Sequence, residues 1–189
     1  MKRTFAIIAV LCSFTLLGVS QNTFTKGDKV INAGIGLGNA LYTGSGYTSK
    51  TPPLSLSFEM GVKDELFDEK SSLGIGGYIG YSGAKYEYSG YGTDYSWKYT
   101  NFILGARGVG HYQLIDKFDT YTGLLLGYDI VTSKFTGTIP GGDNYSASSS
   151  GFIWAWFVGG RYYFNDKFGA MAELGYGISY LTLGVSYKF

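Results

Sequence analysis

Residues 54 to 62, LSLSFEMGV, decide the fold because apolar side chains alternate strictly there with polar or small ones. An extended chain places the two sets on opposite faces: Leu54, Leu56, Phe58, Met60 and Val62 against Ser55, Ser57, Glu59 and Gly61. Residues 181 to 189, LTLGVSYKF, repeat the alternation at the other end of the chain. Both segments are predicted to be β-strands with one apolar face and one polar face.

Six further segments show the same alternation less cleanly, and they bring the expected number of strands to about eight. In 120–131 the period is ambiguous because Leu124, Leu125 and Leu126 run together, and Asp129 favours Leu124, Leu126 and Tyr128 as the apolar face. Strands of about ten residues have the length that crosses a bilayer at a tilt near 45°. The other expected strands are 30–41, 72–82, 98–113, 152–164 and 168–177.

The connections between these strands are of two kinds. Those at 63–71, 114–119 and 165–168 are charged and mostly short, as periplasmic turns are. Those expected at 42–53, 84–97 and 132–151 are longer and rich in Gly, Ser and Tyr, and they contain all three prolines. Because the two kinds alternate along the chain, they are expected at opposite ends of one antiparallel barrel.

The composition is typical of a transmembrane barrel rather than of a helical membrane protein. Thirty glycines, 18 tyrosines and 13 phenylalanines accompany a mean hydropathy of only +0.03, because lipid-facing and lumen-facing residues alternate. Residues 21 to 189 carry 13 basic and 14 acidic side chains without a basic stripe, so no nucleic-acid partner is expected. The predicted fold is an all-β, antiparallel up-and-down transmembrane β-barrel of about eight strands.

The first twenty residues have the pattern of a secretory signal peptide. Lys2 and Arg3 precede an apolar run from Phe5 to Leu17, and the small residues Gly18 and Ser20 follow it. We therefore expect residues 1–20 to be removed and residues 21–189 to form one barrel domain. The only cysteine lies within the apolar run, so no thiol chemistry is expected in the mature chain.

With these features, the chain resembles the OmpA/OmpX-like family of small eight-stranded outer-membrane barrels of Gram-negative bacteria. The resemblance covers roughly residues 27–189 and rests on the leader, the terminal alternation and the hairpin GARGVGHY–LIDKFDTYTG at 105–123, with Gln113 between the two parts. It implies location in the cell outer membrane, contact with outer-membrane lipid, and an assembly signal at Phe189, Tyr187 and Val185 for the barrel-assembly machinery. Since the chain stops at Phe189, no peptidoglycan-binding domain is expected.

Charged residues within the strands are expected to face the lumen, because a charged side chain facing lipid near the midplane costs about 2–4 kcal/mol for arginine. An eight-stranded barrel is only wide enough for its own side chains, so such charges are expected to pair and to fill it. A polar path for protons or small solutes, as in a narrow porin-like pore, is the alternative. The residues concerned are Glu59, Arg107, Asp129, Arg161 and Glu173.

The sequence predicts no catalytic, metal-binding or cofactor-binding residues. His111 is the only histidine and lies near the expected periplasmic rim, without a neighbouring nucleophile to activate and away from the outer-leaflet lipid. A metal site lacks a second histidine or a cysteine in the mature chain.

Tyrosines in the long connections are the candidates for recognition, since tyrosine offers contact area and a hydroxyl group at low entropic cost. The set in the second long connection is Tyr86, Tyr88, Tyr91 and Tyr95. Alternatively, these connections simply fold over the barrel mouth. Aromatic residues near the strand ends, including Tyr42 and Tyr81 at the outer side and Tyr162 and Phe168 at the periplasmic side, are expected to form interfacial girdles.

The leading functional hypothesis is a non-enzymatic, monomeric outer-membrane barrel with a structural or surface-interaction role through its extracellular connections. Three alternatives stay open: a narrow pore for small solutes, a lipid-modifying outer-membrane enzyme, and a secreted lipocalin-like carrier. The sequence does not identify the surface partner.

Overall fold

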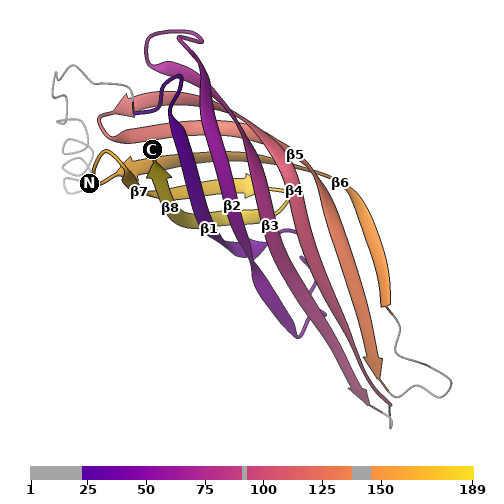
Figure 1. The fold of residues 1–189 in the computed structure, drawn as a ribbon. Coiled ribbons are helices and arrows are strands. Elements are labelled where there is room, and N and C mark those ends of the chain that lie inside the picture. Colours follow the sequence, from indigo (N-terminus) through magenta and orange to yellow (C-terminus); the bar gives the residue numbers. More distant parts are fainter. Residues whose placement is uncertain (1–22, 91–92, 138–145) are drawn as a thin grey trace, which may run out of the picture.

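The computed structural model describes residues 23–90, 93–137 and 146–189, which form one closed barrel of eight antiparallel strands (Figure 1). Each strand pairs with the next along the chain, so the topology is up-and-down. The strands are β1 Lys29–Asn39, β2 Ser49–Asp64, β3 Ser71–Gly90, β4 Thr93–Ile115, β5 Phe118–Gly137, β6 Ser146–Tyr163, β7 Phe168–Tyr176 and β8 Ser179–Lys188. The fold predicted from the alternation is confirmed.

Pairing between the first and last strands closes the ring. The register of β1 against β8 runs from Val30 opposite Lys188 to Asn39 opposite Ser179. Closure leaves neither strand with a free edge along this ladder, as a lipid environment requires. The tight last hairpin turns at Gly177, whose φ of 114° belongs to the region that favours glycine.

Side chains alternate between the outside and the lumen as expected. In β2, Leu56 and Phe58 are 48% and 42% exposed, whereas Glu59 between the outward positions is 2% exposed. In β5, Leu124 and Leu126 face outward and Leu125 is buried in the lumen. The outward face that Asp129 indicated for the ambiguous segment 120–131 is therefore confirmed.

The strands differ greatly in length. β3, β4, β5 and β6 have 20, 23, 20 and 18 residues, whereas β7 and β8 have 9 and 10. Figure 1 shows the long strands running past the rest of the barrel as a curved sheet. We call this part, residues 83–90, 93–100, 131–137 and 146–151, the β3–β6 extension.

The extension corrects the prediction of long connections at 84–97 and 132–151. Most of these residues continue the strands, with Lys85 paired to Lys98 and Lys98 to Lys134. Gly-, Ser- and Tyr-rich composition was interpreted as loop, but such residues still form a ladder when their inward and outward positions alternate. Pro52 and Pro53 likewise lie in β2, at a register shift between Thr51 and Leu54.

Aromatic residues are exposed at both ends of the apolar outer surface, in line with the expected girdles. The turn-end set comprises Tyr112, Tyr162, Phe164, Phe168 and Phe189, and the opposite set comprises Tyr81, Phe102, Tyr128, Phe152 and Tyr176. The prediction that Tyr42 belongs to the outer girdle is wrong, because this residue is only 8% exposed and lies inside the mouth of the barrel.

Residues 23–28 fold back against the turn end of the barrel. Gly27 N donates to Gly61 O at 2.9 Å, and Gly61 N donates to Asp28 O at 2.9 Å. A Cβ at Gly61 would lie 2.1 Å from the Thr25 carbonyl oxygen, so this close approach requires glycine. The segment expected to be a signal peptide, residues 1–20, lies outside the described residues.

In the part of the chain that the structure describes, there is no helix with the length and apolar character needed to cross a membrane.

Because the outward face of the barrel is apolar, the loss of stability caused by an added charge should depend on where along the barrel the charge is placed. Leu183→Arg places a cation in the middle of the apolar surface and should lower the free energy of unfolding by about 2–4 kcal/mol in phospholipid vesicles. Ser148→Arg, on the outer face of the extension, should change it by less than about 0.5 kcal/mol. Urea unfolding of both variants tests this, and an equal loss for the two would contradict a lipid-facing surface.

Candidate functional site

A cluster of charged side chains fills the lumen toward the turn end, and Arg161 lies at its centre. Its Nη2 donates to Glu59 Oε2 at 3.0 Å, and its Nε lies 3.2 Å from Asp119 Oδ2. The Arg161 side chain is fully buried, and both carboxylates are at most 3% exposed. Three different strands, β2, β5 and β6, are thus connected through one guanidinium group.

His111 on β4 joins the same two carboxylates. Its Nδ1 lies 2.9 Å from Asp119 Oδ1, and its Nε2 lies 2.5 Å from Glu59 Oε1. Phe24 covers the group from the turn end, with its ring stacked on the imidazole at a centroid distance of 4.1 Å. Because Phe24 is 3% exposed, residues 23–28 seal this end of the charged cluster.

A second ion pair lies farther from the turn end. Arg107 Nη2 donates to Glu173 Oε1 at 2.7 Å, and the Tyr121 hydroxyl group donates to the same oxygen at 3.0 Å. The Arg107 guanidinium also lies 3.9 Å from the centroid of the Phe157 ring. A cavity of about 40 Å³ between these groups has room for a few water molecules at most.

Asp129 stands apart from both ion-paired groups. It accepts a hydrogen bond of 2.6 Å from Asn101 Nδ2, and Asn101 in turn accepts one from the hydroxyl group of Tyr42 in the β1–β2 connection. Burial, with the nearby Asp129 carboxylate as a smaller cause, raises the pKa of Tyr42 to about 12. The phenol therefore stays protonated near neutral pH and ties this connection to the barrel mouth.

The structure thus places four of the five expected lumen charges in two ion pairs, Glu59 with Arg161 and Arg107 with Glu173. Sequence reasoning missed Asp119 and His111 as members of the first group. Asp119 was assigned to a charged turn, although it shares inward parity with Tyr121 two residues later. This inward parity was the sequence signal that could have identified Asp119 as a lumen residue.

The charged cluster does not have the arrangement of a nucleophile, base and acid. Both ring nitrogens of His111 face carboxylates, so neither is directed at a serine or threonine hydroxyl group. Arg161 already supplies the cation between Glu59 and Asp119. Within the described ranges, no group of three or more His, Cys, Asp or Glu side chains is arranged to hold a metal ion.

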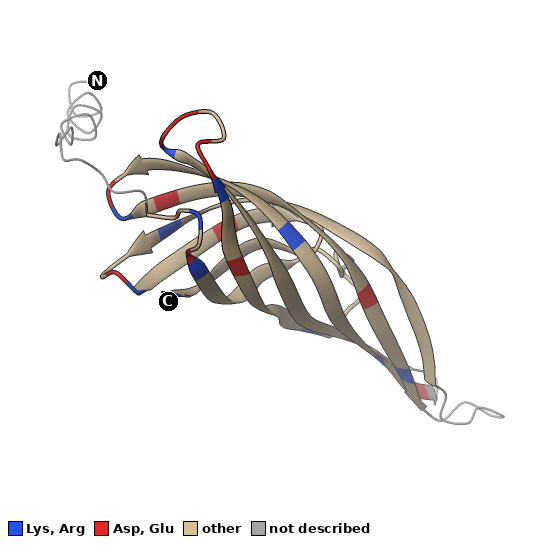
Figure 2. Ribbon diagram, turned by 45° about the horizontal axis from the view of Figure 1, so that its top comes forward, with Lys and Arg blue, Asp and Glu red and all other residues tan. Residues whose placement is uncertain are grey.

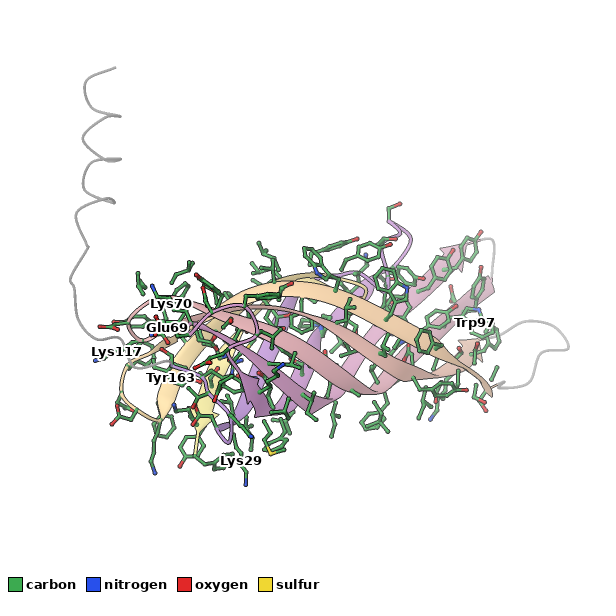
Figure 3. All side chains as sticks on the ribbon, turned by 90° about the horizontal axis from the view of Figure 1, so that it is seen from above. Lys29, Glu69, Lys70, Trp97, Lys117 and Tyr163 are labelled. Carbon is green, nitrogen blue, oxygen red and sulfur yellow. The ribbon has the colours of Figure 1, made fainter. Side chains whose placement is uncertain are left out.

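Rings gather on the inner face of the β3–β6 extension, which continues the lumen face of the barrel. The Tyr88 and Tyr95 rings stack at a centroid distance of 5.2 Å, and Trp97 lies 5.1 Å from Phe135. We call Tyr86, Tyr88, Tyr95, Trp97, Tyr99 and Phe135 the aromatic face. Figure 3 shows Trp97 at the far end of the molecule from Lys70, Lys117 and Tyr163.

The recognition candidates therefore lie on strands rather than on loops. Tyr86 and Tyr88 are in β3 and Tyr95 is in β4, opposite Tyr88 in the register. Tyr91 lies outside the described residues. Tyr47 and Tyr42 extend the ring contacts to the mouth of the barrel, with centroids 5.2 Å apart.

The terminal residues expected to form an assembly signal have outward side chains near the turn end, of which Val185 and Phe189 are exposed and Tyr187 is half-buried. Phe189 and Val185 are 58% and 61% exposed, and the Phe189 ring meets Tyr187 edge to face at 5.2 Å. Phe189 N donates to Lys29 O at 3.1 Å, which anchors the last residue to β1.

Comparisons with known proteins identify the fold. The chain is similar to the crystal structure of Ail, the attachment invasion locus protein of Yersinia pestis, in complex with the heparin analogue sucrose octasulfate: the TM-score is 0.55 and the identity 18%, over 87% of this chain and 100% of that one. It is also similar to the N-terminal β-barrel domain of Pseudomonas aeruginosa OprF, with a TM-score of 0.52 and 16% identity over 87% and 98% of the two chains. No family model and no curated protein sequence matches.

These similarities confirm the expected resemblance at the level of the fold, that of the small eight-stranded outer-membrane barrels.

The Arg161 cluster predicts strong coupling between its charges. Arg161→Met leaves Glu59 and Asp119 buried together without their cation and should cost about 3–5 kcal/mol in the free energy of unfolding. Adding Glu59→Gln and Asp119→Asn should recover a large part of that loss. Urea unfolding followed by tryptophan fluorescence measures both effects, with exposed Lys167→Met as the control. A loss for Arg161→Met no larger than for the control would contradict the coupling.

Proposed function

We propose that this chain is a non-enzymatic integral protein of the cell outer membrane of a Gram-negative bacterium, and that the aromatic face of its β3–β6 extension binds extracellular ligands. The observation that carries the proposal is the position of this face. It continues beyond the level at which the outer surface of the barrel changes from apolar to polar.

That change of surface supports the membrane assignment. On the outer face of β4, Leu104 and Phe102 are exposed apolar residues, and Thr100, Lys98 and Ser96 follow them toward the tip. An apolar surface ending in aromatic residues is what an outer-membrane barrel presents to lipid. Outer-membrane lipid is then a partner along the apolar surface, and the terminal residues Val185, Tyr187 and Phe189 are the proposed signal to the barrel-assembly machinery.

The chemistry of the aromatic face supports a recognition role. Its rings offer flat apolar surfaces edged by hydroxyl groups, and cross-strand pairing fixes their positions before a ligand arrives. The outer face of the same strands carries Ser, Thr, Lys and two acidic residues, Glu87 and Asp94, instead. This contrast between faces is expected if one of them binds ring-shaped ligands such as saccharides.

The side chains in the lumen do not favour a pore or an enzyme over the proposed recognition role. Two ion-paired groups and the Phe24 ring occupy successive levels of the interior. His111 is directed at two carboxylates rather than at a nucleophile.

The aromatic face is tested with an array of oligosaccharides that includes heparin fragments and with soluble sucrose octasulfate, the analogue bound by Ail. The wild-type barrel in lipid nanodiscs should bind at least one saccharide class, and Tyr86→Ser/Tyr88→Ser/Tyr95→Ser should weaken that binding at least tenfold through loss of ring contacts. Surface plasmon resonance measures the affinities.

The matched control carries Ser146→Ala, Ser148→Ala and Ser150→Ala on the outer face of β6 and should bind as the wild type does. Heat-modifiable migration of unboiled protein on a denaturing gel verifies that each barrel is folded. Absence of binding by the wild type, or equal binding by the tyrosine variant, contradicts the recognition role.

The filled lumen gives a separate prediction for transport. Purified protein in a planar bilayer should show no single-channel steps, because the Arg161 cluster and Phe24 block the interior. Regular conductance steps in the wild type that disappear after boiling would favour the pore instead.

A further inference from the structure

The outer faces of β3, β4 and β5 form a ladder of matched rows that runs from the extension into the apolar surface. From the tip toward the turn end, each row contains one residue from each strand in direct register. The rows are Lys85, Lys98 and Lys134; Gly83, Thr100 and Thr132; Tyr81, Phe102 and Ile130; Ile79, Leu104 and Tyr128; Gly77, Ala106 and Leu126; and Ile75, Gly108 and Leu124.

The first row places three lysines side by side. Like charges directly opposite each other on neighbouring strands are destabilising. The row therefore favours the binding of an anion. Glu87 forms an ion pair with Lys85 on the same strand. Neither Lys98 nor Lys134 has an acidic side chain within 4.0 Å among the residues that the structure describes.

Below the aromatic row, the outer surface is hollowed. Gly77, Ala106 and Gly108 leave two adjoining apolar hollows of about 370 and 590 Å³, which share Phe58 and Gly77. A Cβ added at Gly77 or Gly108 would meet nothing within 4 Å. The hollows are therefore open troughs beside exposed apolar side chains, and hydrocarbon chains suit their apolar lining.

The spacing of the rows matches one leaflet of a membrane. Phe102 and Gly108 are six residues apart, about 20 Å along the strand and roughly 15 Å in depth at a tilt near 40°, which is half of the hydrocarbon core. Lys98 lies four residues above Phe102, roughly 10 Å higher in the same geometry. The anion that reaches the lysines must therefore project well above the acyl chains.

We propose that the lysine row and the two troughs form one binding track for a single outer-leaflet lipid whose saccharide head group carries phosphate. The lysines bind the phosphate, the hydroxyl and aromatic rows border the sugar, and the troughs receive acyl chains. A simple phospholipid carries its phosphate near the aromatic row, too low for the lysines. The track rests on the outer-membrane location proposed above.

Native mass spectrometry of the protein in detergent with added lipopolysaccharide whose inner-core sugars carry phosphate tests the track. The wild type should retain one molecule of this probe. Lys85→Gln/Lys98→Gln/Lys134→Gln should weaken retention at least tenfold because the phosphate loses its cations. Gly77→Leu/Gly108→Leu, whose added Cβ atoms meet nothing within 4 Å, places side chains in the troughs and should also weaken retention at least tenfold while leaving the lysines in place.

The control Lys29→Gln/Lys63→Gln/Lys70→Gln removes the same charge at the turn end, where Figure 2 shows many charged positions, and should retain this lipopolysaccharide within twofold of the wild type. Phosphatidylcholine should show no dependence on the lysine row. Retention of the lipopolysaccharide by the lysine variant at the wild-type level overturns the track. If millimolar inorganic phosphate displaces the bound lipid and the glycine variant retains lipid as the wild type does, the lysines form a general anion site. That result also overturns the track.

Failure of the track can be separated from failure of the proposed function. If the lysine variant keeps wild-type lipid binding but the barrel inserts into nanodiscs and binds saccharides, only the track is wrong. If the wild-type barrel does not insert at all, the outer-membrane location is wrong, and the track fails with it.

Discussion

Closure of the ring between β1 and β8 is the constraint on which the other features of this protein depend. Once Val30 pairs with Lys188 and Asn39 with Ser179, every strand has two neighbours over the shared part of the barrel. The direction of each side chain is then fixed by its parity, outward or inward, and a shift of one residue would reverse all of them. In the proposed outer-membrane location, outward positions must suit lipid, whereas inward positions must share a narrow interior.

The interior satisfies this constraint by combining large charged groups with glycine. A Cβ at Gly74 would lie 2.6 Å from Glu59 Oε1, and one at Gly159 would lie 2.8 Å from the Tyr121 ring. Glycine at these inward positions therefore leaves the space that the ion-paired side chains occupy. Buried charges are costly unless they are paired, so packing and electrostatics here are a single requirement.

The sequence was sufficient for the strands and their faces, because alternation is a local property that each strand carries by itself. It was not sufficient for the contacts across the lumen: which carboxylate meets Arg161 depends on the stagger of strands far apart in the chain, as Glu59 and Asp119 illustrate. Nor did it reveal the extension. Around Tyr86 and Tyr95 the inward residues are aromatic and the outward ones polar, which reverses the lipid-facing pattern and was interpreted as loop.

That reversal of pattern explains why the two faces of the extension differ chemically. Within the proposed membrane span the outer face must be apolar, and the inner face is polar because the lumen holds charges. Beyond the aromatic row water reaches both faces, so Lys98 and Thr100 can face outward while Trp97 and Tyr99 face inward. Rings that pack against one another across strands then hold the longer strands together where neither lipid nor ring closure does so. The aromatic face therefore stabilises the extension as well as exposing a surface to the medium, and a ligand bound there would add to contacts that already exist.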